Sequence, residues 1–313
     1  MAQPSETFDT YDSIGEREDL SDVIYNISPT DTPFLSSAAK TQATAVLHEW
    51  QTDSLAAAVT NNAVIEGDEA TADAVTATTR LSNSSQILDK VVTITGTQEA
   101  VDKAGRASEI AYQIAKKAKE LKRDLESSLT SNNAEVTGGS STARQLGGLG
   151  SWVGTNDVFG SGGASGGLGN TARTNGTQRA FTEAQLKSVI KSVWNAGGNP
   201  QIIMVGPFNK QKLSGFTGNS TRFDAGADAT LYTSVDVYAS DFGQTQVIPN
   251  RFSRDRDAWV LDMDYWGVAF LRDFSMHELA KTGDTEKRQL LVECTLESRN
   301  EAASGLIADL TTS

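Results

Sequence analysis

The chain has 313 residues, a length that allows one elaborated domain or two ordinary ones. Its 40 acidic and 27 basic residues give a net charge of -13, which argues against a protein that neutralises a nucleic-acid backbone over a broad face. The single cysteine, Cys294, excludes an internal disulfide and fits a reducing cytoplasm. No secretory signal opens the sequence and no stretch approaches the roughly 18 apolar residues of a membrane span, so we expect a protein made in the cytoplasm with no membrane partner.

The first part of the sequence predicts extended structure. Residues 1–40 are acidic and sparsely apolar, and Pro29 and Pro33 disfavour regular helix in the second half of this segment. We expect an arm that needs a neighbour to lie on. Residues 44–52 and 86–95 are rich in β-branched side chains, and the stretch between them is dominated by Ala, Thr, Asn and Ser. This pattern predicts a long hairpin-like excursion.

A long helix is the strongest structural signal, and it spans Gln98 to Ser131. Apolar residues recur there every three or four positions, no proline interrupts them, and Gly105 is the only weak helix former of consequence. At about 1.5 Å per residue the helix would be on the order of 50 Å long. The repeating positions are Val101, Ala104, Ala107, Ile110, Ala111, Ile114, Ala115, Ala118, Leu121, Leu125 and Leu129.

Glycine dominates the segment that follows, residues 138–176, which holds 13 of the 27 glycines. Such a density disfavours helix and strand alike, so we expect a long mobile loop. The segment contains neither a Gly-x-Gly-x-x-Gly motif after a strand nor a Gly-Lys-Ser/Thr ending. A solvated loop is therefore favoured over a phosphate-binding one.

The next segment predicts an α/β layer. Thr182 and Gln185 form a capping-box pattern, and Phe181 with Leu186 fits a hydrophobic staple, so a helix should begin at this point. Its expected buried face is Leu186, Val189, Ile190, Val193 and Trp194. The continuous apolar run 202–205 fits a strand buried on both faces, and a short helix should follow from Pro207 to Leu213.

Several further strands are expected, at 231–239, 245–249, 258–263 and 265–271, with a last long one at 288–296. The last strand alternates, with Leu290, Val292, Cys294 and Leu296 on one face and Glu293 and Thr295 on the other. Cys294 is therefore expected in the core. The fold class is α+β, with two layers of different character.

The sequence contains few residues that could form a catalytic or metal-binding site. His48 and His277 are the only histidines, and neither has cysteines nearby, so zinc sites and His-dependent triads are disfavoured. Four aspartates could attract a divalent cation, but arginines are interleaved with them and the spacing of a calcium loop is absent. We expect a mutually neutralising surface made of Asp255, Asp257, Asp262, Asp264, Arg251, Arg254 and Arg256. No catalytic residue, cofactor or metal site is predicted.

Charge patterning suggests contacts between copies of the chain. Residues 41–89 carry seven acidic groups, Glu49, Asp53, Glu66, Asp68, Glu69, Asp73 and Asp89, with Arg80 as the only residue there that is always positive. The predicted long helix concentrates Lys116, Lys117, Lys119, Lys122 and Arg123 toward its C-terminal half. The simpler interpretation is a solvated helix face whose cations complement the helix dipole. The alternative is that the acidic excursion of one copy lies across the basic helix of the next.

Taken in order, these elements resemble the major capsid proteins of tailed bacteriophages, which share the Johnson (HK-97-like) fold. The segments 17–24 (Arg-Glu-Asp-Leu-Ser-Asp-Val-Ile) and 27–35 (Ile-Ser-Pro-Thr-Asp-Thr-Pro-Phe-Leu) are similar to the arm of one large phage capsid subfamily. Residues 204–207 (Met-Val-Gly-Pro) and 293–296 (Glu-Cys-Thr-Leu), with Asn300, are similar to it too. The resemblance covers essentially the whole chain.

The resemblance implies a division of the chain and a role. Residues 1–40 would be the N-arm and 41–92 the extended E-loop. Residues 93–133 and 273–313 would form the peripheral P-domain with the long helix as its spine, and 134–272 the axial A-domain. Many copies would form hexamers and pentamers that close into an icosahedral head around double-stranded DNA, without sequence-specific binding of that DNA. The virion would be the site of the mature protein, after assembly in the host bacterial cytoplasm.

Two departures from the family refine these expectations. Some members cross-link through a lysine in the E-loop, whereas residues 41–89 contain no lysine, so we expect a non-covalent shell. Some members begin with a long removable scaffolding segment, whereas here the arm motif begins within the first 20 residues, so we expect a separate scaffolding protein. A portal is a further implied partner, and decoration proteins are an open one.

Two other classes of protein compete with this interpretation. Another self-assembling surface protein, such as an S-layer or adhesin module, is disfavoured by the missing export signal. A hydrolase is disfavoured by the lack of catalytic residues. Only a capsid protein is expected to show closed shells or capsomers by electron microscopy.

Overall fold

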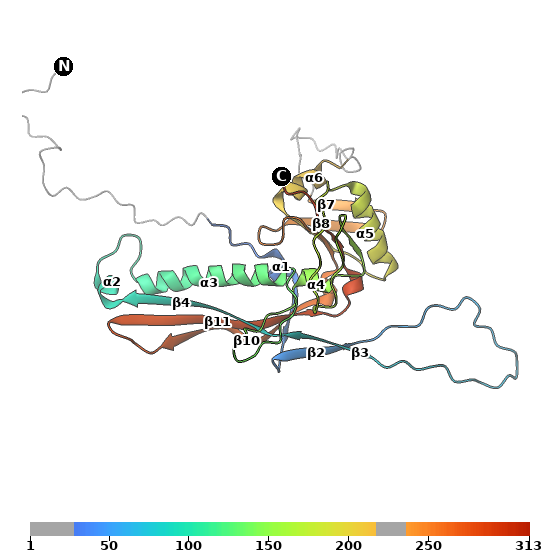
Figure 1. Cartoon of the computed structure of the whole chain (residues 1–313), viewed down its shortest axis with the longest axis horizontal. Coiled ribbons are helices and arrows are strands. Elements are labelled where there is room, and N and C mark those ends of the chain that lie inside the picture. Colours follow the sequence, from blue (N-terminus) through green and yellow to red (C-terminus); the bar gives the residue numbers. More distant parts are fainter. Residues whose placement is uncertain (1–27, 217–235) are drawn as a thin grey trace, which may run out of the picture.

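The structure is a computed structural model that describes residues 28–216 and 236–313. Figure 1 shows an elongated layer in which a long helix runs beside long strands, an α/β unit at one end of that layer, and a hairpin that reaches out beyond it. The arm motif at 17–24 and most of the strand expected at 231–239 lie outside the described residues.

The elongated layer contains a four-stranded sheet in the order β1-β10-β11-β4. Its strands are β1 (Ala39–Gln42), β10 (Trp266–Leu279), β11 (Thr285–Ser298) and β4 (Gln86–Thr95). β10 and β11 form an antiparallel hairpin of two 14-residue strands, and β1 pairs in parallel with the first residues of β10. Hydrogen bonds along β11 therefore hold β10 and β4 on either side of it.

The predicted single helix over 98–131 is wrong at its N-terminal end. A short α2 (Gly96–Ala100) is followed by a loop, and the long helix α3 spans Glu109–Leu129. Gly105 in the loop has a φ of +73°, which a helix does not allow, and the Ser108 side chain caps α3 by accepting a hydrogen bond from a backbone amide of its first turn. The 21 residues of α3 give a rod about 30 Å long.

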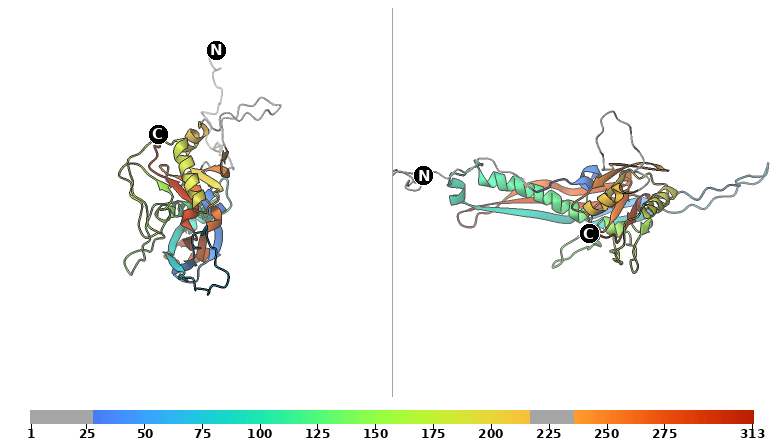
Figure 2. Two further views of the ribbon diagram at one scale, coloured as in Figure 1. Left: turned by 90° about the vertical axis from the view of Figure 1, so that its right-hand side faces the viewer. Right: turned by 90° about the horizontal axis from the view of Figure 1, so that it is seen from above.

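The helix α3 packs on the sheet with its apolar side. Leu121, Leu125 and Leu129 are buried, and α3 contacts β4 and β11. Seen from above, α3 runs along the sheet with β4 on one side and the C-terminal strands on the other (Figure 2, right). The core beneath α3 also contains Phe34, Trp152, Trp259, Trp266, Val268, Cys294 and Leu296, which confirms the expected burial of Cys294.

A short helix, α1 (Pro33–Ser37), docks against α3 through a buried carboxylate. The two Glu126 oxygens accept hydrogen bonds at 2.8 Å from the backbone amides of Phe34 and Leu35. The amide nitrogen of Asn250 donates a third bond to Glu126 at 2.7 Å. Burial raises the pKa of Glu126, although these three bonds oppose the shift. One side chain thus joins α1, α3 and the α/β unit.

The α/β unit is a six-stranded sheet in the order β5-β12-β9-β6-β8-β7, with helices packed against it. Its strands are β5 (Asp157–Val158), β12 (Gly305–Ile307), β9 (Ala258–Leu261), β6 (Ile202–Val205), β8 (Gly243–Pro249) and β7 (Val237–Ser240). Its helices are α5 (Glu183–Asn195) and α6 (Pro207–Ser214), and the short 3₁₀ turns η1 (Met263–Tyr265) and η2 (Glu301–Ala303) border it. The strand predicted at 202–205 is confirmed.

Helix α5 begins as predicted. Thr182 and Gln185 form the reciprocal capping box, which satisfies two backbone amides of the helix start. One prediction for its buried face is wrong, because the Trp194 side chain is 53% exposed. It lies against Phe242 with ring centroids 5.1 Å apart, at the rim of the unit. Trp194 is the last residue of the apolar run, and it contacts the connection between β7 and β8 instead of the core.

The predicted boundaries between layers also differ from the structure. β12 returns to the six-stranded sheet, although 273–313 was assigned to the layer of the long helix. β4 belongs to the four-stranded sheet, although 86–92 was assigned to the excursion. The reason is that strand partners are set by distant segments, which sequence order does not reveal.

Candidate assembly surfaces

The hairpin excursion exposes apolar side chains far from any core. Its base is β2 (Leu47–Thr52) paired antiparallel with β3 (Thr79–Ser84), and residues 53–78 form no helix or strand. Five large apolar side chains in this stretch are 72% to 99% exposed, namely Leu55, Val59, Val64, Ile65 and Val75. So many apolar groups in one projecting segment mark an interaction surface.

The acidic residues singled out in the sequence lie at the far end of the excursion. Glu66, Asp68, Glu69 and Asp73 are all exposed, and the segment reaches away from α3 (Figure 1). Arg80 lies on β3 near the base, where its Nε is 3.5 Å from an Oε1 of Glu49 across the hairpin. The structure therefore brings Arg80 to Glu49 and not to the acidic tip.

The basic residues of α3 are spread around the helix. Lys116 and Lys119 are exposed, whereas Lys117 donates a hydrogen bond to Glu120 at 2.6 Å. That bond, with the charges of neighbouring lysines, holds the pKa of Glu120 below its usual value. Lys117 is thus partly neutralised within its own helix, and Lys116 and Lys119 are more available to a partner.

The last two cations of the set rest on aromatic rings. The Lys122 Nζ lies 5.9 Å from the ring centroid of Phe274, and the Arg123 guanidinium lies 5.0 Å from that of Phe252. These cation–π contacts orient the side chains without neutralising them. Within one subunit the acidic tip and the basic helix are apart, so a contact between them would join two copies.

The base of the excursion is anchored by polar and aromatic contacts. The Trp50 indole donates a 2.7 Å hydrogen bond to the Ser298 carbonyl and packs against Trp152, with ring centroids 5.4 Å apart. On β3, the fully buried Asn83 accepts a bond from the Gly147 amide and donates one back to the Gly147 carbonyl. The excursion therefore leaves the body at a fixed point.

His48 belongs to this anchor, as a packing residue. Its Nε2 lies 3.4 Å from a Glu297 oxygen, and the same oxygen accepts a 3.0 Å bond from the Thr41 hydroxyl. Arg299 donates to the second oxygen at 3.0 Å. The bond with His48, followed by those with Arg299 and Thr41, lowers the pKa of Glu297 to about 2.

The glycine-rich segment is packed, which contradicts the expected mobile loop. Leu146, Leu149 and Val153 are fully buried, and Trp152 is 1% exposed. A single helical turn, α4 (Leu149–Trp152), carries the Trp152 side chain into the core beneath α3. The glycines allow close approach, since a Cβ at Gly169 would lie 2.7 Å from the Trp152 ring.

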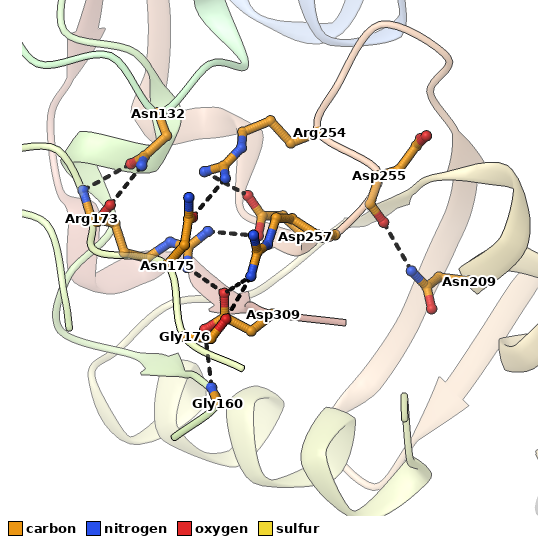
Figure 3. A network of polar contacts seen from close by, with 11 residues as sticks. Asn132, Gly160, Arg173, Asn175, Gly176, Asn209, Arg254, Asp255, Asp257 and Asp309 are labelled. Atoms are coloured by element: carbon orange, nitrogen blue, oxygen red, sulfur yellow. Dashed lines mark hydrogen bonds and ion pairs between the residues drawn. The ribbon is translucent and has the colours of Figure 1, made fainter. Parts of the chain in front are cut away.

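A buried ionic network holds this segment against the rest of the chain (Figure 3). The Arg173 side chain is fully buried and lies 2.7 Å from Asp257 and 3.4 Å from Asp309, which are buried as well. Arg256 donates to Asp309 at 2.7 Å, and Arg254 lies 3.3 Å from the second oxygen of Asp257. The expectation of a neutralising surface is wrong for Asp257, which is fully buried, whereas Arg254 and Arg256 stay partly exposed and do pair with carboxylates.

The pKa values of the two carboxylates in the network shift in opposite directions. Burial raises the pKa of Asp257, although Arg173 and Arg254 oppose the shift. Burial acts on Asp309 in the same direction, but the backbone amides of Gly160 and Gly176 and the nearby arginines leave its pKa lowered. Sequence reasoning missed Arg173 and Asp309, because 136 residues separate them.

The remaining aspartates of the sequence cluster have local roles. An Asp262 oxygen accepts a 2.9 Å bond from the Asn199 amide, and Asp264 accepts one from the Gln201 side chain. Across 28–216 and 236–313, no three acidic, histidine or cysteine side chains are grouped so as to hold a metal ion. No helix in the described parts of the chain has the length and apolar character needed to cross a membrane.

The extended arrangement of helix layer, α/β unit and projecting hairpin agrees with comparisons to known proteins. A family model described as the SU10 major capsid protein matches residues 3–311. The chain belongs to this family. The major capsid protein of Escherichia phage Phieco32 is 30% identical over 351 residues, which covers 98% of this chain and 97% of that protein. The protein is therefore a structural subunit of a tailed-phage head and a component of the virion, not an enzyme.

Solved structures confirm the fold of this capsid protein. The capsid asymmetric unit of cyanophage A-1(L) matches with a TM-score of 0.66 at 14% identity and covers 97% of this chain and 99% of that one. The capsid of a native GTA particle matches with a TM-score of 0.63 at 12% identity, over 96% and 97%. The SrpI encapsulin complex from Synechococcus elongatus PCC 7942 gives 0.55 at 12%, over 96% and 94%. The α+β, HK-97-like fold predicted from the sequence is thus confirmed.

Proposed function

We propose that copies of this capsid protein assemble as hexamers and pentamers into an icosahedral head that encloses double-stranded DNA. The observation that carries the proposal is the excursion, whose residues 53–78 present apolar and acidic side chains that no core of their own subunit covers. A neighbouring copy is the partner that every subunit of a shell meets. Electron microscopy of the purified chain tests the proposal, because it predicts capsomers or closed shells.

We propose a division into capsid domains that the arrangement of the sheets supports. The hairpin from β2 to β3 would be the E-loop, and the layer of α3 with the four-stranded sheet the P-domain. The six-stranded unit, with the glycine-rich segment 138–176, would be the A-domain, and 1–40 the N-arm. Compared with the sequence-based division, the E-loop would be shorter and the A-domain would gain β12.

The excursion of one copy would lie across α3 of the next. The acidic tip with Glu66, Asp68, Glu69 and Asp73 and the cations Lys116, Lys117, Lys119, Lys122 and Arg123 have opposite charge and are apart within one subunit. Complementary charge of this kind gives orientation and register to association. Arg80 would stay on its own subunit, paired with Glu49.

A charge reversal tests this contact. The triple variant Lys116→Glu, Lys117→Glu and Lys119→Glu should fold but fail to form heads, because like charges would then face each other. Circular dichroism and gel filtration check the subunit, and electron microscopy counts the heads. A matched control reverses three lysines away from α3, Lys187, Lys191 and Lys281, and should leave assembly intact. Normal heads from the α3 variant would contradict the proposed contact.

The shell would be held without covalent links through the excursion. Residues 41–89 contain no lysine, so the excursion offers no amine for an isopeptide bond. Heads boiled in detergent should run as single subunits on a denaturing gel. A ladder of multiples would contradict this proposal.

The head would enclose the DNA without binding its phosphates strongly. With a net charge of -13 the chain lacks the cationic excess that neutralises phosphates, so a packaged genome could slide along the wall. Salt-sensitive DNA binding by the subunit at physiological ionic strength would contradict this. A separate scaffolding protein, a portal and, in some heads, decoration proteins are further partners that the family resemblance suggests.

A further inference from the structure

We infer that residues 16–27 bind in a groove on their own subunit, between α3 and the outer edge of β10. The groove has a volume of about 610 Å³, and we call it the β10 groove. Residues 16–27 lie outside the described parts of the chain, and they come just before the residues that lead into the groove. The groove is lined by residues of α1, β1, α3 and β10, among them Leu35, Lys40, Lys122, Phe270, Asp273 and Phe274.

The groove lies where β10 extends beyond β1. β1 pairs with Gly267 to Phe270 only, and from Leu271 to Leu279 the outer edge of β10 has no strand partner among the described residues. At roughly 3.4 Å per residue this free edge is about 30 Å long. Proteins normally cover or pair an exposed edge of this length, so a further segment is expected beside it.

The floor of the groove exposes apolar side chains beside α3. Phe274 is 39% exposed and Met276 is 52% exposed. Phe274 lies on the α3 side of the sheet, because the Lys122 Nζ is 5.9 Å from its ring centroid. Met276 lies on the same side, because it is in register through β11 with Lys90, which pairs with α3. The occupant should therefore bring apolar side chains of its own.

Cations without ion-pair partners border the groove. Lys40 and Lys122 line it, and Lys119 lies one turn of α3 before Lys122. Within 28–216 and 236–313 none of these three lysines forms an ion pair with a carboxylate. Among the residues that line the groove the only carboxylate, that of Asp273, accepts a hydrogen bond from the backbone amide of Phe274. The groove therefore favours an acidic occupant.

The segment 16–27 meets these requirements. Four of its residues are acidic and one, Arg17, is basic. Its second half is apolar and rich in residues that favour strands, namely Val23, Ile24, Tyr25 and Ile27. Fully extended, the segment would reach roughly 40 Å, enough to follow the free edge of β10. Charge, apolar contact and strand addition thus favour the same occupant.

The path of the chain favours the segment of the same subunit over that of a second copy. The described residues begin at Ser28, and Thr32 already lines the groove at the start of α1. Glu126 of α3 holds the first turn of α1 in place through two backbone amides. Residues 16–27 are thus tethered at one end of the groove, and so short a tether gives a high effective concentration for binding within one chain.

Photo-cross-linking in the unassembled full-length subunit tests the placement, independently of the proposed assembly. A benzophenone amino acid in place of Met276 should give adducts that mass spectrometry maps to residues 16–27. When isotope-labelled and unlabelled subunits are mixed before irradiation, both ends of each adduct should come from one chain. The matched control places the same group at Val91, which is 46% exposed and next to Lys90 on the opposite face of the sheet, and should give no such adduct. Adducts to residues 53–78, adducts between a labelled and an unlabelled chain, or no adducts would overturn the inference.

Limited proteolysis gives a second measurement. Arg17 is the only trypsin site before Lys40, so the rate of cleavage after Arg17 reports how readily the segment leaves the groove. The double variant Lys40→Glu and Lys122→Glu should speed this cleavage roughly tenfold, because like charges would repel the segment. Lys116→Glu should leave the rate within about twofold, since residue 116 lies roughly 120° around α3 from Lys122 and away from the groove.

A milder variant guards against a folding defect. Lys40→Gln with Lys122→Gln removes the two charges without adding carboxylates beside Asp273, and should give an intermediate cleavage rate. Equal cleavage rates in the Lys116→Glu and the double glutamate variants would refute the groove. Such a result would leave the proposed assembly untouched, because the assembly is measured by the formation of heads and this inference by the state of one subunit.

Discussion

The excursion 53–78 and the glycine-rich segment 138–176 look alike in composition and behave in opposite ways. Both are rich in small residues and mostly lack helix and strand. In the excursion Leu55 is 99% exposed, whereas in the glycine-rich segment Leu149 is fully buried. The difference lies in buried partners, since Arg173 bonds the second segment to carboxylates elsewhere and the first segment has no such anchor beyond its base. Irregular structure can thus be either core or contact surface.

The largest effect should come from removing the anchor of the glycine-rich segment. Arg173→Ala leaves Asp257 and Asp309 buried without their shared cation, which should cost about 3–5 kcal/mol of unfolding free energy. Urea unfolding of the unassembled subunit measures the loss. As a control, Arg80→Ala removes an exposed pair and should cost less than about 1 kcal/mol. Equal losses of unfolding free energy in the two variants would show that the buried network stabilises the subunit no more than an exposed ion pair does.

Truncating one leucine in each segment tests the comparison directly. Leu149→Ala opens a cavity in the core and should cost about 3 kcal/mol, whereas Leu55→Ala should leave the stability of the subunit unchanged. Leu55→Ala is instead expected to reduce the yield of heads. Thermal unfolding and particle counts distinguish the two effects, and a stable Leu149→Ala subunit would contradict the packing of the segment.

The junction between the body and the excursion should show an acid-sensitive contribution. The pKa of Glu297 lies near 2, below its usual 4.5, because of its bonds with His48, Arg299 and Thr41. A lowered carboxyl pKa stabilises the fold above pH 4.5, and this contribution, about 2 kcal/mol after solvent screening, is lost as the pH falls toward 2. Glu297→Gln should flatten this part of a stability-against-pH curve. An unchanged acid limb would exclude the role.

The smallest effect on stability is expected from alanine substitutions at two glycines of the glycine-rich segment. Gly147→Ala would place its Cβ 2.7 Å from the Gly169 carbonyl oxygen and should cost about 1–2 kcal/mol. Gly139→Ala meets nothing within 4 Å and should be neutral or slightly stabilising. Denaturant midpoints of the two variants make the comparison. Similar midpoints would mean that the close approach at Gly147 is not required.

Local signals in the sequence predicted local structure well. The capping box of Thr182 and Gln185 located the start of α5, and the apolar run at 202–205 located a buried strand. The break before α3 also had a signal, since Gly105 is followed by Ser108, a good N-cap residue. Helical periodicity continued across it and concealed the break.

Contacts between distant residues could not be predicted. Arg173 meets Asp257 across 84 residues and Asp309 across 136, and no periodicity links such positions. The composition of the glycine-rich segment suggested solvent, because glycine density says nothing of the partners that surround it. The sequence identified the acidic tip and the basic helix, but only the structure shows that they lie apart within one subunit.

The separation between a fixed base and an irregular tip has a consequence for how heads reach their final form. In the proposed contact residues 53–78, which form no helix or strand, would be fixed against a neighbour, and fixing each residue costs conformational entropy. This cost would offset part of the attraction, so a single docked tip would hold a neighbour only weakly. Weak links let a wrongly placed subunit dissociate and try again. Many such links acting together around a closed shell make the correct arrangement the one that persists.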